Sequence, residues 1–255
     1  MFYPGFVSIS FRDHTIDEIV QAANNSGLKY IEWGSDIHAP FQDDAALARI
    51  SSLQAMHGIV CCSYGTYFRL GFTPVSELPQ YIQAAKKLGT NILRLWAGRK
   101  KASDCTQEER DYLFAQCRQA AALAKEQGVI LCMECHRRSY TETMEGALDL
   151  MRHVNSPNFR MYWQPNPDIS VEENLEYIAA LQDYITHIHV FHWERDKRLS
   201  LRDGMDTWKK YLSQLQGSHH LLLEFMPDDS ICSLEREAES LHALTIQITD
   251  KGAFQ

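Results

Sequence analysis

Glycines recur at a fixed interval in the first third of the chain. Gly27, Gly58 and Gly89 lie 31 residues apart, and each separates a helix-like amphipathic stretch from a short apolar run. A glycine just past a helix end suits the left-handed conformation that closes many helices. The interval matches the length of one strand followed by one helix, so the chain is expected to repeat that unit.

The same alternation continues to the end of the chain. Eight apolar, strand-like runs are each followed by a helix-like stretch, and Thr15, Thr106 and Ser170 open capping-box sequences that mark helix starts. Eight such units in 255 residues predict an α/β fold, a single (β/α)8 TIM barrel occupying residues 1–255. A doubly wound open sheet is the rival fold, but no glycine-rich phosphate-binding sequence opens any expected helix. The strands are expected at 6–10, 28–33, 59–62, 91–96, 129–133, 160–163, 185–190 and 220–224.

Composition excludes several classes of protein. The net charge is −8 and no dense basic run is present, which disfavours a nucleic-acid partner because phosphate contacts dominate that affinity. No apolar run approaches the roughly 20 residues that span a membrane, and the N-terminus lacks the basic region of a signal peptide. Seven cysteines, several of them in apolar runs, are interpreted as buried reduced thiols of a cytoplasmic protein rather than disulfides.

Polar side chains stand at the ends of four consecutive expected strands. Glu134 and Glu224 close apolar runs, Gln164 follows a third strand, and His189 comes late in a fourth. Each has a simpler explanation alone: a loop cap, an arginine partner, or a satisfied core histidine. In a TIM barrel, however, the C-terminal strand ends form the active site. Two carboxylates, an imidazole and an amide oxygen there predict a site for a divalent ion that accepts mixed ligands, such as Mn²⁺.

At these positions the sequence resembles the xylose isomerase-like TIM barrels, which include sugar isomerases, ketose 3-epimerases and endonuclease IV. The resemblance covers nearly the whole chain. Its matching stretches are G-L-K-Y-I-E-W at 27–33, L-A-K-E-Q-G-V-I-L-C-M-E-C-H at 123–136, H-I-H-V at 187–190 and L-L-L-E-F at 221–225. In the epimerase branch the metal ligands are Glu, Asp, His and Glu. The positions that match them here are Glu134, Gln164, His189 and Glu224.

Two residues depart from the pattern of that branch. Gln164 stands where those epimerases carry Asp, and Pro167 stands where many carry His. A glutamine can still coordinate a metal through its side-chain oxygen, but it adds no negative charge. The resemblance therefore implies a site with two protein carboxylates instead of three, a lower metal affinity and a more Lewis-acidic ion. A barrel that has lost the metal is the alternative.

The resemblance implies a metal-dependent sugar isomerase or epimerase acting on a ketose or related hydroxyketone. The ion, Mn²⁺ or else Co²⁺, Mg²⁺ or Zn²⁺, would polarise the carbonyl and stabilise a cis-enediolate. Glu134 and Glu224, on opposite faces of the substrate, would act as acid and base. Return of the proton to the same carbon gives epimerisation and return to its neighbour gives aldose–ketose isomerisation, and both stay open.

Several further residues are predicted to contact the substrate. His136 lies two residues after Glu134, so on an extended chain both side chains could point the same way. Arg195, six residues after the predicted metal-binding histidine, resembles an arginine that contacts substrate hydroxyls in the epimerase branch. Arg137 and Arg138 could bind an anionic group or simply face solvent. Glu32, Trp96 and Trp163 end expected strands and are predicted to line the pocket, although aromatic rings there often only pack.

Other classes of function stay open beside this one. A metal-free sugar-binding or regulatory protein could keep the same barrel. An endonuclease IV-like repair enzyme would need a histidine-rich trinuclear zinc site and a basic face, which the acidic balance disfavours. A Schiff-base aldolase would need a lysine at a strand end, and no expected strand ends in one. The resemblance implies a small-molecule sugar substrate and, by analogy, a homo-oligomer.

Overall fold

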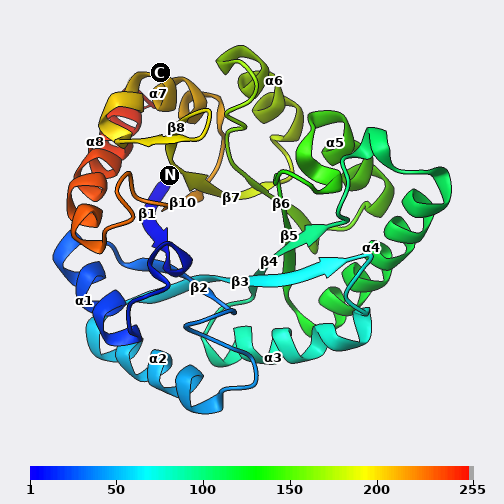
Figure 1. The fold of residues 1–255 in the computed structure, drawn as a ribbon, viewed down its shortest axis with the longest axis horizontal. Helices are drawn as coiled ribbons and strands as arrows, with labels where there is room; N and C mark the ends of the chain where they lie inside the picture. Colours follow the sequence, from blue (N-terminus) through cyan, green and yellow to red (C-terminus); the bar gives the residue numbers. More distant parts are fainter. Residues whose placement is uncertain (253–255) are drawn as a thin grey trace.

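The structure is a computed structural model that describes the backbone of residues 1–252 and the side chains of residues 1–248. Eight parallel strands close into a barrel in the order β1-β10-β7-β6-β5-β4-β3-β2, and helices α1 to α8 surround it (Figure 1). The predicted (β/α)8 barrel is therefore confirmed. The barrel strands are β1 (Phe2–Val7), β2 (Tyr30–Gly34), β3 (Val60–Leu70), β4 (Ile92–Ala97), β5 (Ile130–Glu134), β6 (Phe159–Trp163), β7 (Ile185–Val190) and β10 (His219–Leu223). The helices are α1 (Ile16–Ser26), α2 (Asp44–His57), α3 (Leu78–Lys87), α4 (Gln107–Gln127), α5 (Met144–Val154), α6 (Val171–Leu181), α7 (Met205–Gln214) and α8 (Leu234–Gly252).

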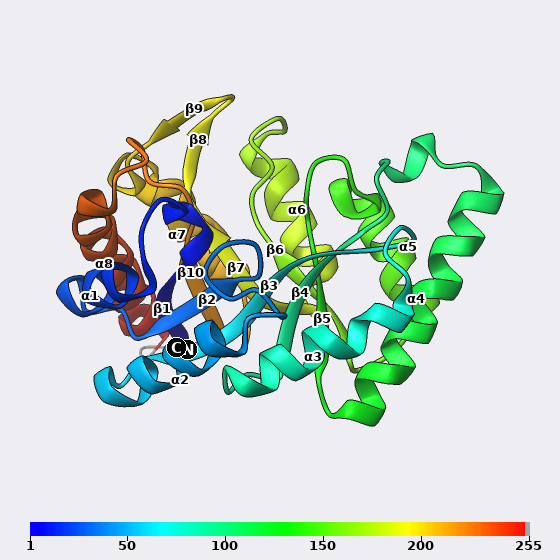
Figure 2. The same ribbon diagram turned by 60° about the horizontal axis from the view of Figure 1, so that its bottom comes forward.

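A short antiparallel hairpin interrupts the alternation after β7. Its strands are β8 (His192–Glu194) and β9 (Lys197–Leu199), and it rises from the end of the barrel at which β7 finishes (Figure 2). Single turns of 3-10 helix occupy several of the loops. They are Ser8–Phe11, Val75–Glu77, Ala102–Asp104, Tyr140–Glu142, Leu201–Gly204 and Ile231–Ser233.

Helix ends follow the signals seen in the sequence. The Thr15 side chain accepts a hydrogen bond from the Glu18 amide, and the Glu18 side chain accepts one from the Thr15 amide. Capping boxes of the same kind begin α4 and α6. Gly27 and Gly128 follow α1 and α4 with φ values of 67° and 68°, which glycine adopts without steric cost. Local sequence thus marks the ends of several of the helices.

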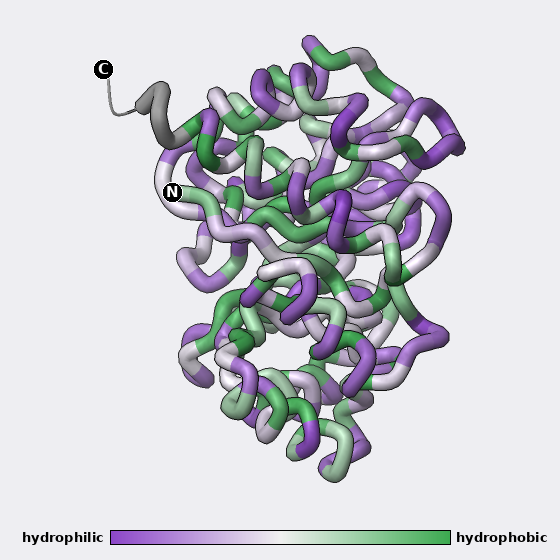
Figure 3. Tube along the Cα trace, turned by 90° about the vertical axis from the view of Figure 1, so that its left-hand side faces the viewer, coloured by the Kyte–Doolittle hydropathy of each residue, from purple (hydrophilic) through white to green (hydrophobic). Residues whose placement is uncertain are grey.

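Apolar side chains fill two layers. The larger layer lies between the strands and the helices, whereas a smaller cluster from alternate strand positions lies inside the barrel. Hydrophobic segments accordingly run through the middle of the molecule and hydrophilic segments lie in the outer loops (Figure 3). The inner cluster consists of Val7, Ile9, Cys62, Cys132, Tyr162 and Leu222. Because these residues fill the barrel, the chemistry is confined to its C-terminal end.

Most strands lie within two residues of their predicted bounds, but β1 and β3 differ by more. The first strand was expected at 6–10, but β1 covers Phe2–Val7 because Phe2 to Phe6 pair with β10, a partner from the other end of the chain. On the other side of β1, Gly5 permits close pairing with β2, since a Cβ there would lie 2.3 Å from the Tyr30 carbonyl oxygen. β3 was expected to stop at 62 but continues to Leu70, because its second half pairs with β4. Ser63 and Gly65 are thereby brought into the barrel wall.

Two predictions from composition can be compared with the structure. Among the described residues, no helix combines the length and apolar character needed to cross a membrane. All seven cysteines lie in the described part of the chain and are free, in agreement with the interpretation as thiols. Five of them are buried: Cys61, Cys62, Cys117, Cys132 and Cys135.

Candidate active site

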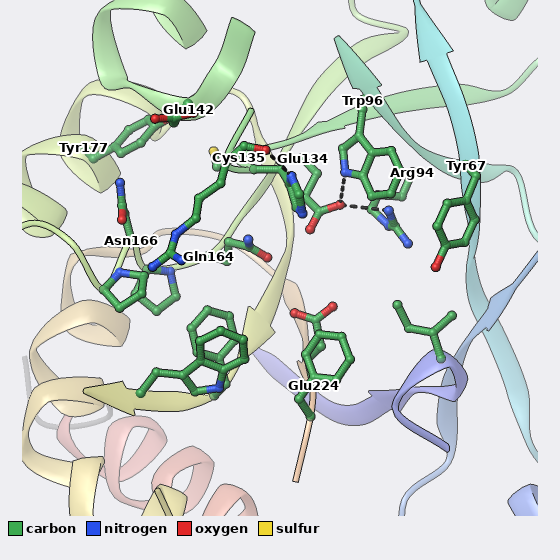
Figure 4. A pocket seen from close by; sticks show the side chains of 18 of the residues that line it. Tyr67, Arg94, Trp96, Glu134, Cys135, Glu142, Gln164, Asn166, Tyr177 and Glu224 are labelled. Atoms are coloured by element: carbon green, nitrogen blue, oxygen red, sulfur yellow. Dashed lines mark hydrogen bonds and ion pairs between the residues drawn. The ribbon is translucent and has the colours of Figure 1, made fainter. Parts of the chain in front are cut away.

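The four predicted metal ligands lie together at the C-terminal end of the barrel. Glu134 is the last residue of β5, Gln164 and Glu224 directly follow β6 and β10, and His189 lies in β7. Parallel strands all finish at the same end of a barrel, so these neighbouring strands direct the four side chains to one place. Figure 4 shows the carboxylates of Glu134 and Glu224 facing each other, with the Gln164 amide beside them.

The donor atoms converge on one nitrogen. His189 Nδ1 lies 3.1 Å from Gln164 Oε1, 3.6 Å from Glu134 Oε1 and 3.6 Å from Glu224 Oε2. One ligand atom from each of Glu134, His189 and Glu224 lies within 4.8 Å of the others. Metal–ligand bonds of about 2.1 Å place neighbouring ligand atoms about 3.0–3.4 Å apart. The four donors therefore fit a divalent ion after a small contraction of the site.

An arginine that the sequence analysis did not select lies inside this cluster. Arg94, in the middle of β4, is 1% exposed. Its Nε donates to Glu32 Oε1 at 3.1 Å and its Nη1 donates to Glu134 Oε2 at 2.8 Å. Trp96 Nε1 donates to the same Glu134 oxygen at 2.6 Å. A charged residue inside the apolar run Ile92–Trp96 was the available signal, since a buried charge requires a partner.

The ion pairs keep two buried glutamates charged. Burial opposes ionisation of Glu32, but Arg94 and His189 outweigh it and lower the pKa of Glu32 to about 2. Burial likewise opposes ionisation of Glu134, and Arg94 and His189 hold its pKa well below the ordinary value. The pKa of Arg94 is raised, because three nearby glutamates overcome the effect of burial. Both Glu32 and Glu134 are therefore carboxylates at neutral pH.

Glu224 and His189 behave differently. Burial raises the pKa of Glu224 to about 7; His189 opposes the shift and the charge of Glu134 adds to it. Burial would lower the pKa of His189, yet Glu224, Glu134 and Glu32 together raise it to about 10. The three carboxylates thus favour a positive charge at the centre of the cluster, and the protonated His189 ring supplies it. A metal ion at the same place would supply that charge instead and would displace the proton.

A cavity of about 250 Å³ opens above the cluster. Glu134, Gln164 and Glu224 line its floor, whereas His189 is fully buried below. Two residues predicted to contact substrate, His136 and Trp96, also line the cavity, with their ring centres 5.0 Å apart. Arg137 lines it as well and pairs with Asp168 at 2.9 Å.

Three residues predicted to contact substrate lie outside the cavity lining. Glu32 is fully buried under the floor, where it binds Arg94. Trp163 is also fully buried and packs against Trp208 and Tyr211, because strand alternation turns it outward when the next residue, Gln164, faces the cavity. Arg195 is exposed at the turn of the β8–β9 hairpin, with a left-handed φ of 56°.

The cavity wall contains residues that sequence reasoning missed. Arg12 donates hydrogen bonds to Tyr67 and Asp36, and Arg12 and Tyr67 both line the cavity. Phe191, Trp193 and Phe225 form an aromatic part of the wall. Phe191 and Phe225 lie just after β7 and β10, Trp193 lies in the hairpin strand β8, Tyr67 lies in the unexpected second half of β3, and Arg12 lies in a loop.

Comparisons with known proteins agree with this fold. The model of a family described as xylose isomerase-like TIM barrel matches residues 20–244. A 3-dehydroshikimate dehydratase from Bacillus anthracis is 23% identical over 197 residues, which are 71% of this chain and 69% of that protein.

Two solved structures show the same fold at low identity. The probable 3-DHS dehydratase involved in petrobactin synthesis from Bacillus anthracis superposes with a TM-score of 0.80 at 19% identity, over 95% of this chain and 99% of that one. The D-psicose 3-epimerase from Clostridium cellulolyticum H10 superposes with a TM-score of 0.73 at 14% identity, over 96% and 99%. Because the family model covers most of the chain, the protein belongs to the xylose isomerase-like TIM-barrel family.

Proposed function

We propose that this protein is a metal-dependent isomerase or epimerase that acts on a ketose or a related hydroxyketone. One observation carries the proposal: the carboxylates of Glu134 and Glu224 face each other across the cavity floor, with the donor atoms of His189 and Gln164 beside them. Two opposed carboxylates are what proton removal from one face of a carbon and delivery to the other face require.

The metal would be held by four atoms that already converge. They are Glu134 Oε1, Gln164 Oε1, His189 Nδ1 and Glu224 Oε2. When bound, the ion supplies Lewis acidity that polarises a substrate carbonyl and stabilises the negative charge of an enediolate. Mn²⁺ suits this mixture of oxygen and nitrogen donors best, and Co²⁺, Mg²⁺ or Zn²⁺ would also fit.

The carboxylates of Glu134 and Glu224 differ in the contacts that hold them. Glu134 Oε2 is held by Arg94 and Trp96, which leaves only Oε1 toward the cavity. The Glu224 carboxylate has one polar contact among the described residues, its ion pair with His189. Glu134, which is ionised at neutral pH, therefore removes the proton next to the carbonyl, and Glu224, whose raised pKa of about 7 lets it carry a proton, delivers one from the opposite face. Delivery to the same carbon inverts it, whereas delivery to the neighbouring carbon converts a ketose to an aldose.

The rest of the cavity suits a small polyhydroxylated molecule. His136, with Tyr67 and Trp96, places polar atoms along the wall. The aromatic rings of Phe191, Trp193 and Phe225 offer flat apolar faces for the C–H groups of a sugar and exclude water. A small-molecule sugar substrate, a cytoplasmic location and assembly into a homo-oligomer belong to the same proposal.

Dehydration is a second candidate, favoured by the similarity to the 3-dehydroshikimate dehydratase. It would begin with the same proton removal next to a carbonyl. The resulting anion would then expel a neighbouring hydroxyl group as water, with protonated Glu224 as the acid, instead of accepting a proton on carbon. Arg12 and Arg137 line the cavity and would suit a substrate carboxylate.

Solvent exchange tests the proposal and separates the two candidates. Protein loaded with Mn²⁺ would be incubated in D₂O with D-tagatose, D-allulose, L-ribulose or 3-dehydroshikimate, and the products examined by NMR and mass spectrometry. Isomerase or epimerase activity predicts deuterium on the carbon next to the carbonyl, together with an epimer or aldose. Dehydration predicts a product lighter by one water.

The Glu224→Gln variant is the control and should show neither product. Metal-loaded wild-type protein that neither exchanges deuterium into these compounds nor dehydrates any of them would contradict proton abstraction. Protein that takes up no metal after dialysis against Mn²⁺ would favour the metal-free sugar-binding alternative.

A further inference from the structure

A fully buried ion pair lies directly beneath the candidate metal site. Glu32 is 0% exposed and Arg94 is 1% exposed, and the Nε to Oε1 distance is 3.1 Å. The interior of a TIM barrel is usually filled by apolar side chains, and a buried ion pair is often less stabilising than such packing. The pair is therefore expected to have a role other than stability.

One role is suggested by the far nitrogen of His189. Its Nδ1 faces the three candidate oxygen ligands, while its Nε2 is buried and has no hydrogen-bond partner among the described residues. Glu32 Oε1 lies 3.7 Å from Nε2. A shift of about 0.6 Å would turn this contact into a hydrogen bond. An imidazole that donates Nε2–H to a carboxylate keeps the Nδ1 lone pair for a metal.

The same pair also orients Glu134. Arg94 Nη1 and Trp96 Nε1 both donate to Oε2, at 2.8 Å and 2.6 Å, so Oε1 is the oxygen left for an ion. Glu32 in turn is fixed by Ser63, whose hydroxyl donates to Oε2 at 2.8 Å. Glu32 is thus linked to two candidate ligands, directly to His189 and through Arg94 to Glu134.

The backbone leaves space for this arrangement at Gly65 in β3. A Cβ atom there would lie 2.4 Å from Glu32 Oε1 and 3.0 Å from Arg94 Nη2. Since Gly65 is not among the glycines with positive φ, space rather than backbone conformation requires glycine here. The absence of a side chain at Gly65 in β3 therefore leaves room for the Glu32–Arg94 ion pair.

We propose that Glu32 is a positioning residue that sets the geometry of the metal site through His189 and through Arg94 to Glu134. It touches neither the ion nor the substrate. It fixes which nitrogen of His189 and which oxygen of Glu134 face the ion. The inference rests on the proposed function, because it needs the ion to bind at these donors.

Metal affinity and the state of the His189 ring test the proposal together. The dissociation constant for Mn²⁺ would be measured by electron paramagnetic resonance for wild type, Glu32→Gln and Gly65→Ala. Loss of such a partner typically weakens metal binding by about 10- to 100-fold, so both variants should bind Mn²⁺ more weakly by that factor. Gly65→Ala displaces Glu32 while keeping every charged group. Asp149→Asn is the control, because Asp149 also pairs with an arginine, Arg110, and neither residue lines the cavity; it should leave the constant unchanged.

NMR of ¹⁵N-histidine-labelled protein loaded with Zn²⁺ provides the second measurement. Wild type should show a protected Nε2–H signal from His189, absent in His189→Asn, that shifts in Glu32→Gln. Folded Glu32→Gln and Gly65→Ala proteins that bind Mn²⁺ within twofold of wild type would overturn the inference and leave the proposed function intact. Wild-type protein that binds no Mn²⁺ would overturn both.

Discussion

Replacement of Arg94 by methionine tests how the barrel tolerates charge in its interior. Methionine has a similar length but no charge, so the variant leaves the carboxylates of Glu32 and Glu134 without the partner that lies 3.1 Å and 2.8 Å away. Their side chains are 0% and 4% exposed, so water can replace little of the lost interaction. Breaking one buried ion pair by removing a partner costs about 3–5 kcal/mol. We expect Arg94→Met to lower the free energy of unfolding of metal-free protein by at least about 3 kcal/mol.

Urea unfolding in the presence of EDTA measures this change. Arg49→Met is the control, because Arg49 pairs with Asp17 at the surface, where the two side chains are 53% and 57% exposed. Exposed pairs contribute about 1 kcal/mol or less, so the control should unfold close to wild type. The double variant Arg94→Met with Glu32→Gln should be less destabilised than the two single changes added together, because each change removes the other residue's partner.

The loss in the Arg94 variant should also depend on pH. In folded wild-type protein the pKa of Glu32 is about 2, which is below its pKa in the unfolded chain. The stabilisation from the charged Glu32 is therefore complete above the unfolded pKa and is lost as pH falls toward 2. Without Arg94, the lowering effect of His189 is left to oppose burial, so we expect the folded pKa of Glu32 to rise above the unfolded value and the variant to lose stability as pH rises. The difference between the two proteins should therefore widen from about pH 4 to about pH 8. An Arg94→Met protein within about 1 kcal/mol of wild type at pH 8 would refute this reasoning.

Three further predictions concern the metal site and its support. Gln164→Glu places a carboxylate of the same size beside His189, so it should tighten Mn²⁺ binding by about tenfold. Weaker binding of the variant in a metal titration would argue against Gln164 as a ligand. Mn²⁺ at 100 times its dissociation constant should raise the free energy of unfolding by about 2.7 kcal/mol, seen as a rise in Tm that EDTA reverses; an unchanged Tm would contradict binding to the folded state. Thr141→Val removes the buried hydroxyl that donates to the Glu134 carbonyl oxygen. It should lower the free energy of unfolding in urea by about 1–3 kcal/mol while the protein still binds Mn²⁺. A change near zero would show that this hydrogen bond does not hold the end of the strand.

The barrel could be predicted from the sequence because its signals are local. Capping boxes, helix-ending glycines and apolar runs act within a few residues, and their repetition identified the strand–helix units. The bounds of β1 and β3 could not be predicted in the same way. Pairing of Phe2–Phe6 with β10 and of the second half of β3 with β4 depends on strands distant in the sequence.

The candidate site could be predicted in part for a related reason. Strand ends meet at one end of a barrel, so Glu134, His189 and Glu224 were brought together by topology alone. Arg94 was missed because it lies in the middle of a strand. Trp163 turned outward because neighbouring strand residues face opposite sides, and the position of Arg195 depends on a hairpin whose geometry no short motif specifies.

The most direct test of the account is the metal content of the purified protein. Wild type and the variants Glu134→Gln and Glu224→Gln would be dialysed against Mn²⁺, freed of excess ion and analysed by inductively coupled plasma mass spectrometry. We expect about one ion per wild-type chain and a loss of that ion in both variants. A wild-type chain without bound metal, or variants that retain it fully, would contradict a metal site built from these glutamates.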